Sequence, residues 1–156
     1  MSIRLIALGH KAPRWIDDGC TQYRNRLPRE WHFEERLLKA ERRNEHTPAE
    51  QIKSREAERI DDTWKDCTIR IVLDERGHLY TSREFAALID QHQTQRERMA
   101  WVIGGTDGLD NRIIQSAHTT LSLSRFTLPH DLARLVLMEQ LYRASTVLSG
   151  HPYHRD

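Results

Sequence analysis

The chain alternates short apolar runs with longer stretches in which apolar residues recur every three or four positions. Compact apolar runs are typical of buried strands, whereas strict alternation of apolar and charged residues is typical of a half-exposed strand. Among the predicted strands, only His32–Lys39 shows the alternation of apolar and charged residues. The predicted strands are Ile3–Leu8, His32–Lys39, Ile69–Leu73, Met99–Ile103 and Thr119–Leu123.

The stretches between these runs predict helices. Thr47, Pro48 and Glu50 have the form of a capping box, and Asp110 is a suitable N-cap. The segment 74–77 reads as a turn that closes the third strand. The predicted helices cover residues 15–27, 47–66, 82–95, 110–117 and 130–148. Strands that alternate with helices predict one α/β domain over residues 1–156, a parallel sheet with helices on both faces.

The last predicted helix has apolar residues on more than one stripe, too many for one face of a sheet to cover. A second apolar face favours a subunit interface, and we predict a homodimer. The alternative is a central helix inside one chain, which a domain of this size has little depth to bury. The residues concerned are Leu132, Leu135, Val136, Leu137, Met138, Leu141, Tyr142, Ala144, Val147 and Leu148.

Composition narrows the class of protein without identifying a partner. Charged residues make up 30% and hydrophobic residues 38% of the chain, and the formal net charge is +1. Bulk charge therefore does not indicate a nucleic-acid-binding protein. The segment 24–43 is locally rich in arginine, which suits phosphate contacts or, alternatively, a solvated surface of mixed charge.

Targeting signals and cysteine patterns are not evident. The two cysteines, Cys20 and Cys67, are far apart and outside any CxxC pattern, so neither a disulfide framework nor a zinc site is expected. The first apolar run is too short for a signal peptide and is interrupted by Arg4. No apolar run approaches the roughly 18 residues of a membrane span. We expect a cytoplasmic protein with no membrane partner.

Two loops have the composition of ligand-binding segments. Gly104-Gly105-Thr106-Asp107-Gly108 follows a strand end, where parallel α/β sheets bind ligands. Its spacing matches neither the dinucleotide fingerprint nor the P-loop, and a simple glycine turn has the same appearance. The segment 121–130 begins with a Leu/Ser alternation and continues as a tightly held loop, or as an ordinary strand-to-helix connection.

The last six residues carry two imidazoles, a phenol and a guanidinium. Gly150 is a plausible helix C-cap, and Pro152 prevents the helix from continuing. Six extended residues span only about 20 Å, so the partner of this tail must lie near the helix end. The spacing of His151 and His154, with His130 upstream, does not match a metal-ligand pattern, and no metal is expected.

Several stretches together resemble the RlmH family of trefoil-knotted SPOUT methyltransferases. They are Val102–Leu109, Leu121–His130, Glu139–Ala144, His151–Arg155 and, at the start of the chain, Ile3–Lys11. The resemblance covers essentially the whole chain, and the order and spacing of the stretches are specific. The chain departs from the family in having Thr106-Asp107 where Pro-Glu is frequent, and Asp131 where Pro is common.

The resemblance implies a single-domain α/β knot with a deep trefoil knot in the C-terminal half, a homodimer, and S-adenosylmethionine as methyl donor. It implies methylation of N3 of a pseudouridine in 23S rRNA on the assembled ribosome. Carried over by position, most cofactor contacts are made by backbone. They fall on Leu73, Gly104, Leu123, Ser124, Arg125, Phe126, Thr127 and Leu128.

Methyl transfer to an imide nitrogen requires removal of its proton, and histidine is a suitable base. His154 and His130 are the candidates. Arg143 and Arg155 could stabilise the developing charge or hold a phosphate, and Tyr153 could stack on a base.

Lys11, Tyr153 and Arg155 are the expected RNA contacts. The alternative for the tail residues is a surface held against a partner subunit. Two other classes of function stay open: a non-catalytic ribosome-binding or nucleotide-sensing module, and a metal-dependent hydrolase that uses the histidines.

Overall fold

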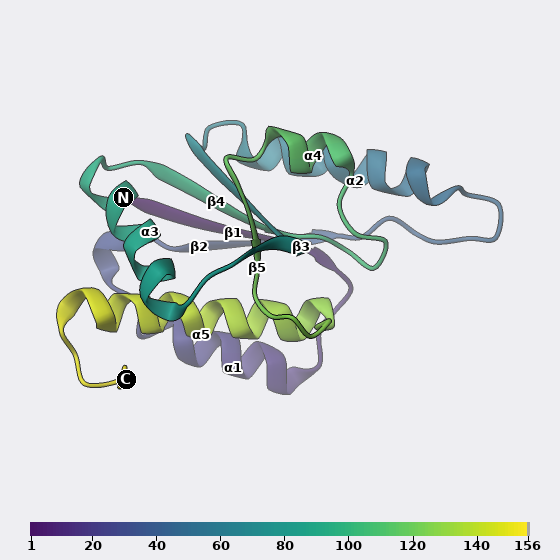
Figure 1. Ribbon diagram of the computed structural model, residues 1–156. Coiled ribbons are helices and arrows are strands. Elements are labelled where there is room, and N and C mark those ends of the chain that lie inside the picture. Colours follow the sequence, from purple (N-terminus) through teal and green to yellow (C-terminus); the bar gives the residue numbers. More distant parts are fainter. Residues whose placement is uncertain (156) are drawn as a thin grey trace.

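The computed structural model describes residues 1–155 as an α/β domain of three layers (Figure 1), and Asp156 lies outside the described residues. Strands and helices alternate along the chain. The elements are β1 (Ser2–Gly9), α1 (Arg14–Arg24), the 3-10 turn η1 (Arg29–Trp31), β2 (Glu34–Lys39), α2 (Ala49–Trp64), β3 (Ile69–Leu79), α3 (Ser82–Thr94), β4 (Arg98–Ile103), α4 (Asn111–Ser116), β5 (Thr119–Ser122) and α5 (His130–Ser149).

The strands form one sheet in the order β2-β1-β4-β3-β5. Every pairing in it is parallel, as the alternation of strands and helices predicts. Because all strands run the same way, their carboxyl ends lie along one edge of the sheet. The loops that follow β1, β3, β4 and β5 therefore leave the sheet on the same side.

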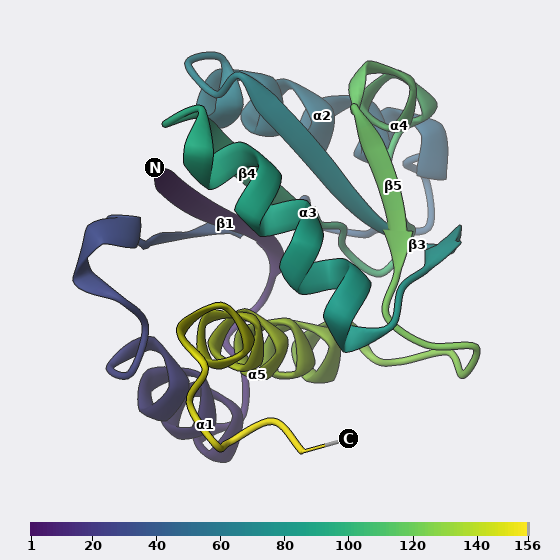
Figure 2. The same cartoon turned by 60° about the vertical axis from the view of Figure 1, so that its left-hand side comes forward.

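Helices cover both faces of the sheet, as predicted (Figures 1 and 2). On one face α1, α3 and α5 pack over a core that includes Leu5, Trp101 and Phe85. On the other face α2 and α4 pack over a core that includes Ile6, Val102 and Trp64. Alternate residues of the same strand belong to different cores, which explains why the central strands are apolar throughout.

The apolar pattern of α5 is explained in part within one chain. Helix α5 packs between α1 and α3 and also contacts β1 and β4, so several of its sides are covered (Figure 2). Leu137, Met138 and Leu141 are fully buried there. The pattern by itself therefore does not require a subunit interface, because a helix flanked by two others needs more than one apolar stripe.

Two local predictions were wrong. Helix α2 begins after Pro48 without a side-chain cap, and the Thr47 hydroxyl instead donates to Asn44 at 2.7 Å. The segment 74–77 does not end β3. Its register shifts between Leu73 and His78, and both residues pair with the same residue of β5, so the segment is a bulge.

Other end signals were confirmed. The Asp110 carboxylate accepts a hydrogen bond from the Arg112 amide at 2.8 Å and caps α4. Gly150 ends α5 in the left-handed conformation, with φ of 70°. The depth of a trefoil knot stays a prediction. Among the helices of residues 1–155, none has the length and apolarity that a membrane span requires.

The bulge in β3 depends on Gly77. A Cβ atom at this position would lie 2.6 Å from the backbone carbon of Leu121. We expect Gly77→Ala to lower the free energy of unfolding by about 1–3 kcal/mol, because β3 and β5 must separate to admit the methyl group. Urea denaturation measures this change. Gln91→Ala on the exposed side of α3 is the control, and equal stability of the two variants would contradict the prediction.

Candidate active site

A large cavity of about 770 Å³ lies at the bulge of β3 and at the carboxyl ends of β4 and β5. Its walls come from four separate stretches of the chain and from a few single side chains. The lining residues are 73–76, 103–109, 122–124 and 126–130, together with Lys53, Asn111 and Ala133. A volume in this range suits a ligand the size of a nucleoside cofactor.

Most of the predicted cofactor residues line this cavity. They are Leu73, Gly104, Leu123, Ser124, Phe126, Thr127 and Leu128. Arg125 does not line it and is exposed. The Phe126 amide donates to the Ser124 hydroxyl at 2.9 Å, and the Ser122 hydroxyl donates to the Ser124 carbonyl at 2.9 Å. These bonds hold the loop in place although the Phe126 ring is 83% exposed.

The glycine loop forms the opposite wall. The Gly108 amide donates to the Gly105 carbonyl at 3.0 Å, and Gly108 has a φ of 80°, which favours glycine. A Cβ atom at Gly104 would lie 2.8 Å from Cγ of Leu109 and 3.2 Å from the backbone of Gly108. The loop therefore closes tightly on itself at Gly104.

An ion pair that the sequence did not reveal holds the glycine loop from outside. Arg43, in the segment that projects beyond β2 (Figure 1), donates to the Asp107 carboxylate with Nε at 2.8 Å. This bond lowers the pKa of Asp107. The two residues are 64 positions apart, and charged residues are so frequent in this chain that no local pattern identified the pair.

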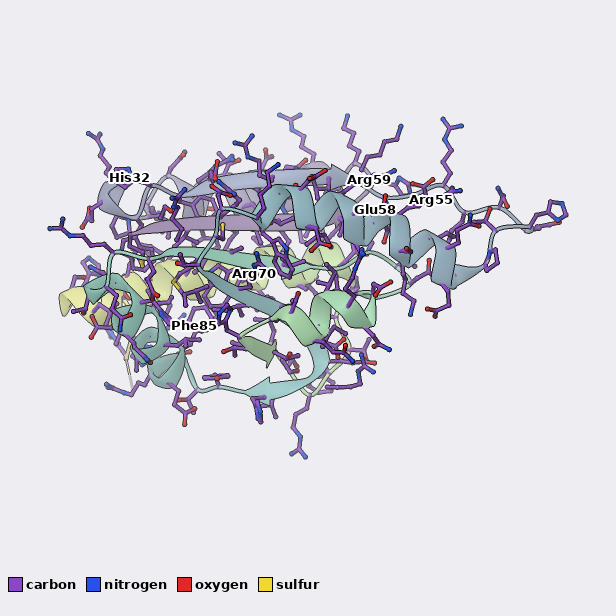
Figure 3. All side chains as sticks on the ribbon, turned by 90° about the horizontal axis from the view of Figure 1, so that it is seen from above. His32, Arg55, Glu58, Arg59, Arg70 and Phe85 are labelled. Atoms are coloured by element: carbon purple, nitrogen blue, oxygen red, sulfur yellow. The ribbon has the colours of Figure 1, made fainter. Side chains whose placement is uncertain are left out.

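A buried carboxylate supports the same region. Glu56 is 5% exposed and accepts a hydrogen bond from the Glu41 amide at 3.0 Å, and burial raises the pKa of Glu56. Glu41 in turn accepts from Arg55 and Arg59, which project from α2 (Figure 3). A Cβ atom at Gly105 would lie 3.4 Å from the Glu56 carboxylate. Helix α2 thus supports both the projecting segment and the glycine loop.

The cavity carries more negative than positive side chains. Its acidic lining residues are Asp74, Glu75 and Asp107, and its lysine and arginine lining residues are Lys53 and Arg76. Arg76 donates to Asp74 at 2.8 Å and lowers the pKa of that carboxyl group. Asp74 is paired with Arg76 and Asp107 with Arg43, whereas within residues 1–155 no ion pair involves Glu75. Glu75 is therefore the carboxylate of this wall that can attract a positively charged ligand group.

A smaller cavity of about 350 Å³ adjoins the larger one. His130, the first residue of α5, lines both. Lys11, predicted to contact RNA, lines the smaller cavity only. The structure therefore brings His130 together with the predicted cofactor residues, while Lys11 lies in the cavity on the other side of His130.

The other predicted catalytic residues form a separate cluster on α5. The Arg143 guanidinium lies 4.8 Å from the Tyr153 ring centroid and 3.4 Å from Nδ1 of His154. Glu139 accepts from Arg143 at 2.6 Å and from the Tyr153 hydroxyl at 3.1 Å. The Tyr153 ring also meets Tyr142 edge-on at 4.8 Å. The tail is thus folded back onto its own helix.

This tail cluster lies away from both cavities. Arg143 is thirteen residues along α5 from His130, which is about 20 Å at 1.5 Å per residue. None of Arg143, Tyr153, His154 and Arg155 lines either cavity. The tail leaves α5 at the end opposite the cavity loops (Figure 1). One chain therefore separates the predicted catalytic residues into two groups.

Within the described part of the chain, no group of three or more His, Cys, Asp or Glu residues is placed to hold a metal ion.

Comparisons with known proteins agree over the full length of the chain. The family described as "Predicted SPOUT methyltransferase" matches residues 1–154. The protein named ribosomal RNA large subunit methyltransferase H from Methylibium petroleiphilum is 40% identical over 156 residues, with 100% of each chain covered. The protein of the same name from Thiobacillus denitrificans is 42% identical, again with 100% of each chain covered.

Solved structures show the same fold at low sequence identity. A probable methylase family protein from Haemophilus influenzae aligns with a TM-score of 0.60 and 17% identity, covering 99% of this chain and 70% of that one. A probable methyltransferase from Bordetella pertussis aligns with a TM-score of 0.59 and 19% identity, covering 91% and 95%.

The packing of the tail predicts an unusual titration of Tyr153. Burial, a hydrogen bond with Tyr23 and the Glu139 carboxylate raise its pKa from 10.0 to about 12. Because the folded value is the higher one, the neutral phenol stabilises the fold below pH 10, and this contribution is lost as the pH rises through 12. In a pH titration followed by tyrosinate absorbance, the Tyr153→Phe variant should lack the transition at the highest pH. Circular dichroism at each pH checks that the protein stays folded. An unchanged curve would contradict the prediction.

Proposed function

Because the chain belongs to the SPOUT methyltransferase family, we propose that it transfers a methyl group from S-adenosylmethionine to large-subunit ribosomal RNA. The proposed acceptor is N3 of a pseudouridine in 23S rRNA of the assembled ribosome, in the cytoplasm. One observation carries the proposal. The segments that carry the resemblance, at residues 102–109 and 121–130, are separated in sequence and meet around one cavity.

The residues of the larger cavity fit the proposed cofactor. The backbone of the glycine loop and of residues 123–128 can bind the nucleoside part through main-chain groups. The carboxylate of Glu75 suits the positive sulfonium and amino groups, since Asp74 and Asp107 are already paired with Arg76 and Arg43. S-adenosylmethionine, when bound, supplies an electrophilic methyl group.

The chain's own residues must orient the acceptor and remove its proton. Much of the rate acceleration can come from holding the acceptor atom about 3–3.5 Å from the methyl carbon. His130 is the candidate that we favour for accepting the imide proton, since it lines the larger cavity and its side chain is 32% exposed. Arg143 and His154 are the other candidates for charge stabilisation and proton transfer.

A second copy of the chain would bring these groups together. Arg143, Tyr153 and His154 cannot reach the cavity of their own chain from the far end of α5. We propose a homodimer in which the tail of one protomer completes the cavity of its partner. The tail is held in a defined position for this role, because Tyr153 and Arg143 share Glu139 as acceptor within one chain.

Methylation of intact ribosomes tests the proposed function. With isotopically labelled S-adenosylmethionine, the protein should label 23S rRNA in ribosomes that lack the modification, and nucleoside mass spectrometry should identify N3-methylpseudouridine. Free 23S rRNA is the control substrate and should be labelled poorly. Removal of residues 151–156 should lower turnover by about 100-fold or more while calorimetry shows unchanged cofactor affinity.

Ribosome binding without methyl transfer would instead favour the non-catalytic module. Full turnover by the truncated protein would show that the tail takes no part in the mechanism.

Mixing two inactive variants tests the shared site. Gly104→Val should prevent cofactor binding, because the larger side chain meets Leu109 and the Gly108 backbone. After subunit exchange with the tail-truncated chain, each mixed dimer should contain one complete site, and activity should return to about a quarter of the unmodified level. No recovery, with exchange verified by native mass spectrometry, would show that each site is built from one chain. Thr127→Trp serves as a second cofactor-blocking variant if Gly104→Val does not fold.

A further inference from the structure

We infer that the smaller cavity binds the acceptor nucleotide of the RNA, with its phosphate between Lys11 and Lys39 and its base toward His130. The inference rests on the proposed function and names the substrate-binding part of the same site. It starts from a cavity in which the sequence predicts a role for Lys11 and His130 only.

The position of the cavity suits a nucleotide beside the cofactor. It lies at the carboxyl ends of β1 and β2, between the beginnings of α1 and α5. Its volume of about 350 Å³ is at the lower end of the range for small-molecule sites, which is appropriate for one nucleotide. Leu37 of the edge strand β2 is 58% exposed at this cavity and offers an apolar surface to a base.

The two lysines of this cavity have no counter-ion. Within residues 1–155, neither the Lys11 nor the Lys39 ammonium group forms an ion pair or hydrogen bond, and both side chains are exposed. Many cations of this chain do have an acidic partner, as Arg43 and Arg143 show. Unpaired lysines at the edge of a cavity are the groups that bind a phosphate.

The carboxylates at the cavity do not cancel this charge. Asp17 accepts a hydrogen bond from Arg134 at 2.8 Å, and the same guanidinium bonds Glu35 at 2.6 Å. Asp131 lies 3.5 Å from the His130 imidazole. Lys11, Lys39 and Arg134 thus outnumber the two carboxylates of this cavity, Asp17 and Asp131, so an entering anion meets a net positive charge.

His130 separates the two cavities and connects their chemistry. Its imidazole lies over Gly9, where a Cβ atom would be 3.3 Å from the ring atoms Cδ2 and Nε2. A base in the smaller cavity and a methyl donor in the larger one would therefore approach each other beside the same side chain. This geometry places the acceptor edge of the base near the group that we propose as its proton acceptor.

A charge-removal variant tests the inference. Lys11→Gln combined with Lys39→Gln should raise the KM for ribosomes, and weaken ribosome binding, by at least about tenfold. The slope of log affinity against log salt should fall by about 1–2, because one or two phosphate contacts are lost. Calorimetric affinity for S-adenosylmethionine should not change. The matched control is Lys65→Gln with Arg96→Gln, which removes two exposed charges at the opposite edge of the sheet.

A second variant tests the cavity itself without changing charge. Leu37→Trp places bulk at an exposed position of the cavity wall and should lower kcat/KM by about tenfold or more with cofactor affinity intact. Wild-type KM and salt slope in the lysine variant, or wild-type kcat/KM in Leu37→Trp, would overturn the inference.

Binding is measured separately from turnover, so the two proposals can fail separately. A protein that binds ribosomes without methylating them refutes the proposed function, and the lysine variant still decides whether the cavity holds RNA.

Discussion

The parallel direction of all five strands is the constraint on which the site depends. Each strand must be followed by a connection that crosses one face of the sheet. Every strand therefore starts on one side of the sheet and ends on the opposite side, where its following loop leaves. The glycine loop and the 123–129 loop meet there although they leave different strands. The opposite edge is held by charge. Arg4 pairs with Glu34 and Asp66, and this contact lowers the pKa of Asp66 to about 2. These ion pairs join the amino-terminal parts of β1 and β2 to the segment before β3, whereas the loops at the carboxyl ends of the strands surround the cavities.

A buried ion pair fixes the start of α5 relative to β2. The side chains of Arg134 and Glu35 are only 7% and 6% exposed, and Asp17, which is 44% exposed, adds a third charge from α1. Removing Arg134 or Glu35 would leave a buried charge without its partner, which is far more costly than losing a surface ion pair. The three residues come from α5, β2 and α1. These contacts therefore set the direction in which α5 begins, and with it the position of His130 between the two cavities.

The sequence predicted the order of the elements because burial imposes a period on apolar residues. It also located the glycine loop and the Asp110 cap, whose signals are local. The bulge at residues 74–77 was not predicted, because the same turn-forming residues occur where a chain leaves the sheet and where a strand continues after a bulge. Contacts such as that of Arg43 with Asp107 form between segments that are distant in sequence. In a chain with many charged residues, the sequence does not show which two of them pair. The separation of about 20 Å between His130 and Arg143, in contrast, follows from the predicted helix alone, whereas the packing of the tail against α5 became evident only in the structure.

The folded tail also bears on how an assembled enzyme would become active. Ordering a free peptide end costs about 1–2 kcal/mol of backbone entropy per residue. Here Tyr153 is already packed against Tyr142 and bonded to Glu139 in a single chain. Association would therefore deliver a preorganised group rather than a disordered one. In such a dimer the tail would not have to fold after the subunits dock. The site would be complete as soon as the dimer forms, so activity would appear at the rate of dimer assembly.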